Sequence, residues 1–113
     1  MRTFNLAGHT IEFSDCQEIG MGGPEACLMS IDGRPLSGRH FHPTPLVFEG
    51  DVLVPLWEAA RFYVARITPN TLGVRKLSRG FGYMRLLHVE SGEVAFSTWW
   101  DDRETHSIRL VPR

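Results

Sequence analysis

The regular alternation of apolar and polar side chains around two-residue turns constrains the fold of this sequence more than any other feature. Residues 2–13, RTFNLAGHTIEF, alternate on both sides of Ala7-Gly8. Successive side chains of a β-strand point to opposite faces, so this period of two predicts an antiparallel hairpin with one face in the core. A two-residue loop at Ala7-Gly8 would pair Phe4 with Ile11.

A second hairpin is predicted near the C-terminus, where Ser91-Gly92 separates residues 83–90 from residues 93–100. A two-residue turn at this point sets the register of the two strands. The predicted pairs are Val89 with Val94, Leu87 with Phe96, and Tyr83 with Trp100. Both faces of the hairpin would be largely apolar, so we expect it to lie centrally in the fold, covered on both sides, with Leu87 buried.

The middle of the chain is compatible with a helix and with strands. Leu56, Ala60, Tyr63 and Ile67 follow a helical spacing, but apolar residues also occupy the other faces of such a helix. The β-branched and aromatic residues of this region favour strands. We therefore predict strands for residues 55–67, followed by a turn at residues 68–71.

These patterns together predict an all-β fold. A chain of 113 residues accommodates one domain, here residues 1–113, and 42% hydrophobic residues suffice for a core. We expect a compact β-sandwich or half-open barrel of about nine short, mostly antiparallel strands joined by hairpins, with at most one short helix. Asp32-Gly33 predicts a further turn. Residues 15–25 include the glycine-rich tract Gly20–Gly23 and are expected to form a loop.

The two cysteines, Cys16 and Cys27, are eleven residues apart and form no CxxC motif. In a chain of this size they predict two reduced thiols in or near the core rather than a disulfide. The N-terminal residues carry no apolar run of signal-peptide length, and the chain has no candidate transmembrane segment. We therefore expect a cytoplasmic protein without contact to a membrane.

Residues 33–50 resemble the first motif of the cupins, in which a glycine, a His-x-His pair, a glutamate and a second glycine follow one another. The corresponding residues are Gly33, His40, His42, Glu49 and Gly50. The resemblance implies a metal-dependent enzyme or sensor that uses His40 and His42, with His88 as the candidate third ligand. Glu49, however, lies seven residues beyond His42, and prolines occupy positions 43 and 45. This spacing favours a surface histidine pair, on an edge strand or irregular segment, without a metal.

The last candidate site is the run from Trp99 to Glu104. Trp99 and Trp100 alternate at the end of a predicted strand, so they would point to opposite faces and at least one would be exposed. Exposed aromatic residues are typical anchors of protein interfaces. The predicted binding residues are Trp99, Trp100, Asp101, Asp102 and Glu104. The acidic residues, like a second pair formed by Glu49 and Asp51, would face a basic partner.

The sequence contains no recognisable catalytic motif, so we expect a non-catalytic protein without a cofactor. The formal net charge is −1 and the basic residues are dispersed, which argues against nucleic-acid binding. We predict a small bacterial protein that binds another protein, in the manner of an immunity protein that neutralises a toxin. The alternatives are the cupin-like metal protein and a barrel whose mouth binds an apolar small molecule.

Overall fold

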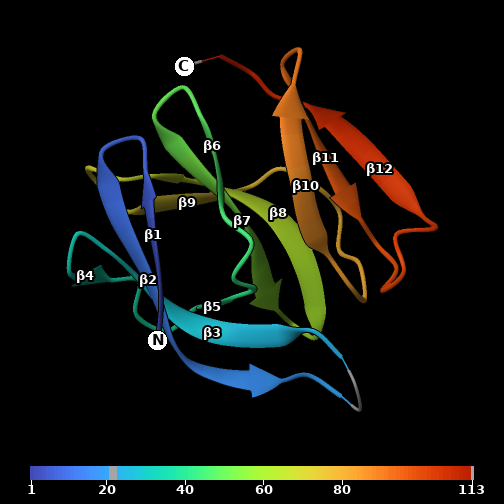
Figure 1. Cartoon of the computed structure of the whole chain (residues 1–113), viewed down its shortest axis with the longest axis horizontal. Helices are drawn as coiled ribbons and strands as arrows, with labels where there is room; N and C mark the ends of the chain where they lie inside the picture. The colour runs from blue at the N-terminus through green and yellow to red at the C-terminus, as the bar shows by residue number, and fades with distance from the viewer. Residues whose placement is uncertain (21–22, 113) are drawn as a thin grey trace.

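The computed structural model of the protein describes residues 1–20 and 23–112. These residues form twelve β-strands and no helix, which confirms the predicted all-β class (Figure 1). The strands are β1 (Arg2–Leu6), β2 (His9–Glu18), β3 (Glu25–Ile31), β4 (Arg34–Pro35), β5 (His40–Phe41), β6 (Leu46–Phe48), β7 (Asp51–Glu58), β8 (Arg61–Thr68), β9 (Gly73–Lys76), β10 (Arg85–Glu90), β11 (Glu93–Ser97) and β12 (Thr105–Arg109). Among the described residues, no helix has the length and apolar character that a membrane span requires.

Nine strands form one large antiparallel sheet in the order β1-β2-β3-β5-β7-β8-β9, with β4 paired to β3 and β6 paired to β7. The predicted pairing of Phe4 with Ile11 is confirmed in β1 and β2. Side chains from β2 and β3 share one apolar cluster, the first core, with side chains from β7 and β8. The sheet therefore bends around the first core as a half-open barrel.

Five hairpins are closed by two-residue turns in which both central residues have positive φ angles. Such turns match the right-handed twist of the strands they join. Four of them end in glycine: Ala7-Gly8, Asp32-Gly33, Glu49-Gly50 and Ser91-Gly92. The fifth, Ala59-Ala60 between β7 and β8, contains no glycine and has φ angles of 51° and 62°. Glu49-Gly50, which matched the cupin motif, is therefore the turn of the β6–β7 hairpin.

β7 and β8 are the central strand pair, which confirms the strand prediction for residues 55–67. Alternate residues of these strands enter two different cores. Those in the first core are Val52, Val54, Leu56, Ala65 and Ile67. Those in the second core, on the opposite face, are Leu53, Phe62 and Val64. A strand pair buried on both faces has no polar side, which explains why its sequence lacks a clear alternation.

The remaining strands, β10, β11 and β12, form a separate three-stranded sheet that closes the second core. Figure 1 shows this sheet packed beside β7 and β8 at one side of the molecule. The predicted central position of the β10–β11 hairpin is therefore wrong. Its strands are also shorter than predicted, since β10 begins at Arg85 and β11 ends at Ser97.

A bulge in β10 corrects the predicted register. Val89 pairs with Val94 as expected, but Leu86, not Leu87, lies opposite Phe96, because the register shifts between Leu86 and His88. Leu86 is 4% exposed, whereas Leu87 is only half-buried. The extra residue of a bulge changes which side chains share a face, and an alternation pattern alone cannot locate it.

We predict that Leu86→Ala lowers the free energy of unfolding by about 2–5 kcal/mol, the usual cost of removing a buried leucine side chain. Leu87→Ala should cost clearly less, because this side chain is only half-buried. Urea denaturation of both variants measures the difference. Equal losses in the two variants would contradict the bulged register.

Cys16 and Cys27 form a disulfide, so the prediction of two reduced thiols is wrong. The antiparallel pairing of β2 with β3 brings residues eleven apart in the sequence onto neighbouring strands. The predicted loop over residues 15–25 is also wrong in part, because β2 continues to Glu18 through an irregularity between Ser14 and Gln17. Residues 21–22 of the glycine-rich tract lie outside the described residues.

We predict that reduction of the Cys16–Cys27 disulfide lowers the free energy of unfolding by about 2–4 kcal/mol, the typical contribution of such a cross-link. Thermal denaturation with and without dithiothreitol measures the change. The variant Cys16→Ala/Cys27→Ala should have a lower Tm than the oxidised protein, and that Tm should not respond to dithiothreitol. An oxidised protein whose Tm ignores the reductant would refute the prediction.

Candidate functional site

The tryptophan loop, residues 98–104, connects β11 to β12 and carries all five residues that the sequence predicts for binding. Trp99 is 43% exposed and Trp100 is 69% exposed. The sequence predicted that these side chains alternate at the end of a strand, but β11 ends at Ser97, so both lie in the loop. Two large aromatic side chains therefore face solvent at the same place.

Hydrogen bonds across its base hold the tryptophan loop in one shape. The Thr98 backbone N–H donates to the Glu104 carbonyl oxygen at 2.9 Å, and the Thr98 hydroxyl donates to Glu104 Oε1 at 2.7 Å. Within the loop, the Asp102 N–H donates to the Trp99 carbonyl at 3.1 Å. The Ser97 hydroxyl donates to the same carbonyl at 2.6 Å. Hydroxyl groups that bond to nearby backbone in this way draw the chain away from strand pairing, which explains why β11 stops here.

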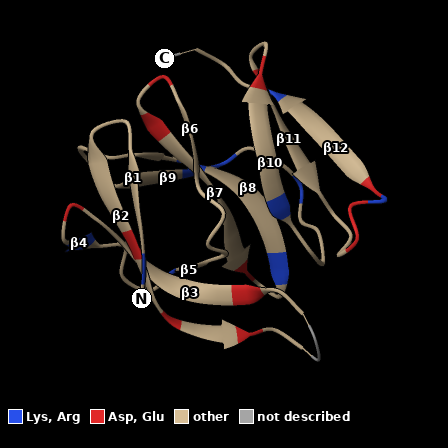
Figure 2. Ribbon diagram, in the orientation of Figure 1, with Lys and Arg blue, Asp and Glu red and all other residues tan. Residues whose placement is uncertain are grey.

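The acidic residues of the loop are engaged by basic neighbours. Asp102 forms an ion pair with Arg85, and Asp101 forms one with Arg103, at 3.1 Å. The Arg103 guanidinium also lies 5.0 Å from the centre of the Trp99 ring. Figure 2 shows acidic and basic residues side by side in this loop. Two of the three carboxylates of the loop therefore have a guanidinium partner, so the surface is aromatic and its acidic character is partly compensated.

Two of these carboxyl groups have lowered pKa values. The hydrogen bond from Arg85, the largest effect, holds the pKa of Asp102 below its ordinary value. The pKa of Glu104 is lowered by its hydrogen bond with Thr98 and then by that with His106. Both carboxylates are ionised at neutral pH, and their contacts help to keep the loop in place.

The histidines of the cupin-like motif do not converge with a third metal ligand. The prolines predicted an edge strand or an irregular segment. β5 is an interior strand between β3 and β7, so the edge strand is wrong, whereas residues 42–45 form the irregular segment. His40 on β5 is exposed, whereas His42 is half-buried, with Nδ1 2.9 Å from the Glu25 carbonyl oxygen. His88 lies on β10, in the other sheet. Among the residues that the structure describes, no three His, Cys, Asp or Glu side chains are grouped closely enough to hold a metal ion.

Burial of His42 makes the stability of the fold depend on pH. Loss of solvent, the largest effect, lowers the pKa of His42 below its ordinary value of 6.5, although the hydrogen bond to Glu25 opposes this shift. The folded protein therefore resists protonation of His42 more than the unfolded chain does. Well above pH 6.5, His42 is neutral in both states, so the lowered pKa does not change the free energy of unfolding. As the pH falls from 6.5 toward the lowered pKa, the unfolded chain binds the proton first, and the free energy of unfolding decreases.

We predict that the free energy of unfolding falls between pH 7.5 and pH 5.5, and that His42→Gln reduces this fall. Glutamine has no titrating group and retains a donor for the Glu25 carbonyl. Urea denaturation at the two pH values, with His40→Gln as the exposed control, measures the effect. A fall in His42→Gln as large as in the parent protein would exclude His42 as its source.

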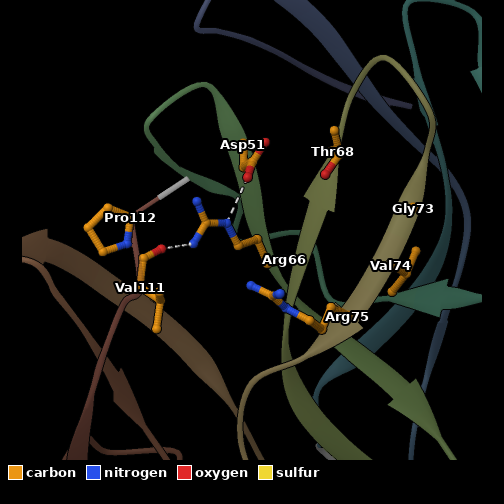
Figure 3. Close-up of a pocket in the computed structure, with 8 residues that line it drawn as sticks. All are labelled: Asp51, Arg66, Thr68, Gly73, Val74, Arg75, Val111 and Pro112. Atoms are coloured by element: carbon orange, nitrogen blue, oxygen red, sulfur yellow. Dashed lines mark hydrogen bonds and ion pairs between the residues drawn. The ribbon is translucent and has the colours of Figure 1, made fainter.

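A polar hollow that sequence reasoning missed lies where β8, β9 and the C-terminal tail meet (Figure 3). Its volume is about 470 Å³, and its lining residues are Asp51, Arg66, Thr68, Gly73, Val74, Arg75, Val111 and Pro112. Arg66 Nε donates to Asp51 Oδ2 at 2.7 Å, and both side chains are buried. The sequence predicted that Asp51 lies on an acidic surface, and this prediction is wrong because Asp51 is buried. The sequence feature that could have indicated this site is Arg66, a charged residue inside the apolar segment RFYVARI.

The polar lining also distinguishes this hollow from the apolar barrel mouth that was considered from the sequence. Apolar side chains fill the interior of the large sheet and form the first core.

Comparisons of the chain with protein-family models, with curated proteins and with solved structures found no match.

Proposed function

We propose that the protein acts by binding another protein through the tryptophan loop, as an inhibitor of the kind that neutralises a toxin. The observation that carries this proposal is the exposure of Trp99 and Trp100 together on a hydrogen-bonded loop. Exposed tryptophans of this kind are the usual anchors of protein interfaces, where a few aromatic residues supply most of the binding energy.

The construction of the loop supports the same proposal. Binding is weakened when flexible segments must be ordered on association, so a surface that is already fixed loses less conformational entropy. Thr98 and Glu104 close the loop at its base, and Arg85 holds Asp102 from the neighbouring strand. The ion pairs would form a polar rim around an apolar centre, and the matching surface on the partner would be an apolar pocket able to receive Trp100.

An inhibitor requires a rigid surface of defined shape and no reactive group, which agrees with the small β-framework described above. The proposal includes a bacterial source for the protein. The cytoplasmic location expected from the N-terminal sequence remains a prediction, and the Cys16–Cys27 disulfide argues against it. Disulfides persist in oxidising compartments and are rare in the cytoplasm.

We predict that Trp100→Ala weakens binding to the partner by about 30-fold, which corresponds to the ~2 kcal/mol of a desolvated tryptophan anchor. The partner is first captured on the tagged protein in the cells that make it and is identified by mass spectrometry. Titration calorimetry with the purified partner then gives Kd. Leu28→Ala is a matched control, since Leu28 is an apolar residue of β3 that is 36% exposed and distant from the loop in sequence and sheet.

Two results would refute the proposal. If Trp99→Ala and Trp100→Ala both bind the captured partner as tightly as the parent protein, the tryptophan loop is not the interface. If expression of the partner alone does not arrest growth, or if co-expression does not relieve that arrest, the protein is not a toxin inhibitor. Circular dichroism of each variant establishes that the fold is intact.

A further inference from the structure

The register of β8 and β9 places the residues that line the polar hollow between these strands and the C-terminal tail. Arg66 pairs with Arg75, and Thr68 pairs with Gly73, so these four residues share one face of the sheet. Glycine leaves the position opposite Thr68 without a side chain. A Cβ atom placed on Gly73 would have one neighbour within 4 Å, Thr71 Oγ1 at 3.3 Å. Gly73 therefore leaves space at this edge of the hollow, and a larger residue there would fill part of it.

Arg66 is the fixed positive group of this hollow. Its residue exposure is 5%, and its guanidinium is held from two sides, by Asp51 Oδ2 at 2.7 Å and by the Val111 carbonyl oxygen at 2.5 Å. The third nitrogen, Nη2, has no hydrogen-bond partner among residues 1–20 and 23–112. In Figure 3 it projects between Asp51 and Pro112, two other residues of the lining. Buried donors are nearly always satisfied, so an unused one requires an explanation.

Arg75 adds a second positive charge directly across from Arg66. Like charges at opposed positions of neighbouring strands destabilise a sheet. Asp51 is the one carboxylate among the described residues of the lining, so in this part of the chain the two guanidinium groups leave an excess of one positive charge. Arg75 is exposed and forms no ion pair with any residue in the described parts of the chain. A negative group bound between the strands would remove the repulsion between the two arginines.

We propose that this hollow is a binding site for the carboxylate or phosphate group of a small organic anion. Arg75 donates to the anion from the solvent side, the Thr68 hydroxyl donates from β8, and Arg66 supplies a fixed positive charge beneath it. Charge-assisted hydrogen bonds from arginine to oxyanions are among the strongest in proteins. The volume of about 470 Å³ is in the range of small-molecule sites. Pro112 provides an apolar contact for the rest of the ligand. The site is separate from the tryptophan loop and does not depend on its role.

Titration calorimetry with inorganic phosphate and with succinate, at constant ionic strength in sodium chloride, tests this site. The native protein should bind at least one of the two anions at one equivalent per chain, with a saturable isotherm. Binding of phosphate alone would identify a phosphate-bearing ligand, and binding of succinate alone a carboxylate-bearing one. Amide resonances of Thr68, Gly73 and Arg75 should shift during the titration in nuclear magnetic resonance spectra.

Two variants with the same change of charge make the test specific. Arg75→Gln should weaken anion binding at least ~10-fold, because it removes a charge-assisted donor. Arg61→Gln is the control: Arg61 is an exposed arginine at the other end of β8, and its replacement should leave binding unchanged. The proposal is wrong if neither anion binds saturably, if Arg75→Gln binds as tightly as the native protein, or if Arg61→Gln loses as much affinity. Arg66 is left intact, because removal of one partner from a buried ion pair can itself unfold a protein.

Discussion

The pairing of β7 with β8 supports both halves of the molecule, because each face of this strand pair is the wall of a different core. Side chains such as Val54 and Ile67 enter the first core, whereas Leu53 and Val64 enter the second. A shift of this pairing by one residue would exchange the two sets of side chains and disrupt both cores at once. The same pairing brings Arg66 of β8 to Asp51 of β7, where the two side chains form the buried ion pair of the hollow. The position of Arg75 opposite Arg66 depends in addition on the pairing of β8 with β9.

Sequence patterns predicted the fold wherever local rules decide the outcome. Three turns with glycine at the second position, Ala7-Gly8, Asp32-Gly33 and Ser91-Gly92, could be predicted because glycine adopts positive φ without strain. The Ala59-Ala60 turn could not, since alanine favours helix and rarely adopts positive φ. For this reason residues 55–67 were compatible with a helix. The bulge beside Leu86 and the proximity of Cys16 to Cys27 both depend on how strands pair across the sheet, which periodicity does not reveal.

The candidate sites show the same division between local and long-range information. The sequence predicted that at least one of Trp99 and Trp100 is exposed, on the premise that they alternate at the end of a strand. Both are exposed, but in a loop, because β11 ends at Ser97. The ion pair between Asp102 and Arg85 could not be predicted, since the two residues are seventeen apart in the sequence. Arg66 was missed for the same reason: its partner Asp51 lies on a different strand, fifteen residues away. Net charge and dispersed arginines gave no indication that two guanidinium groups meet at one end of the sheet.

The Ala59-Ala60 turn also has a consequence for the order in which the protein folds. The outer hairpins are closed by turns that glycine favours locally, so they can begin to form before distant parts of the chain meet. The turn of the central hairpin, β7–β8, contains no glycine, so both alanines must adopt a backbone conformation that costs energy. Its strands gain stability only when the side chains on their two faces are covered. The central strand pair is therefore expected to become ordered late, in the same cooperative step that assembles both cores.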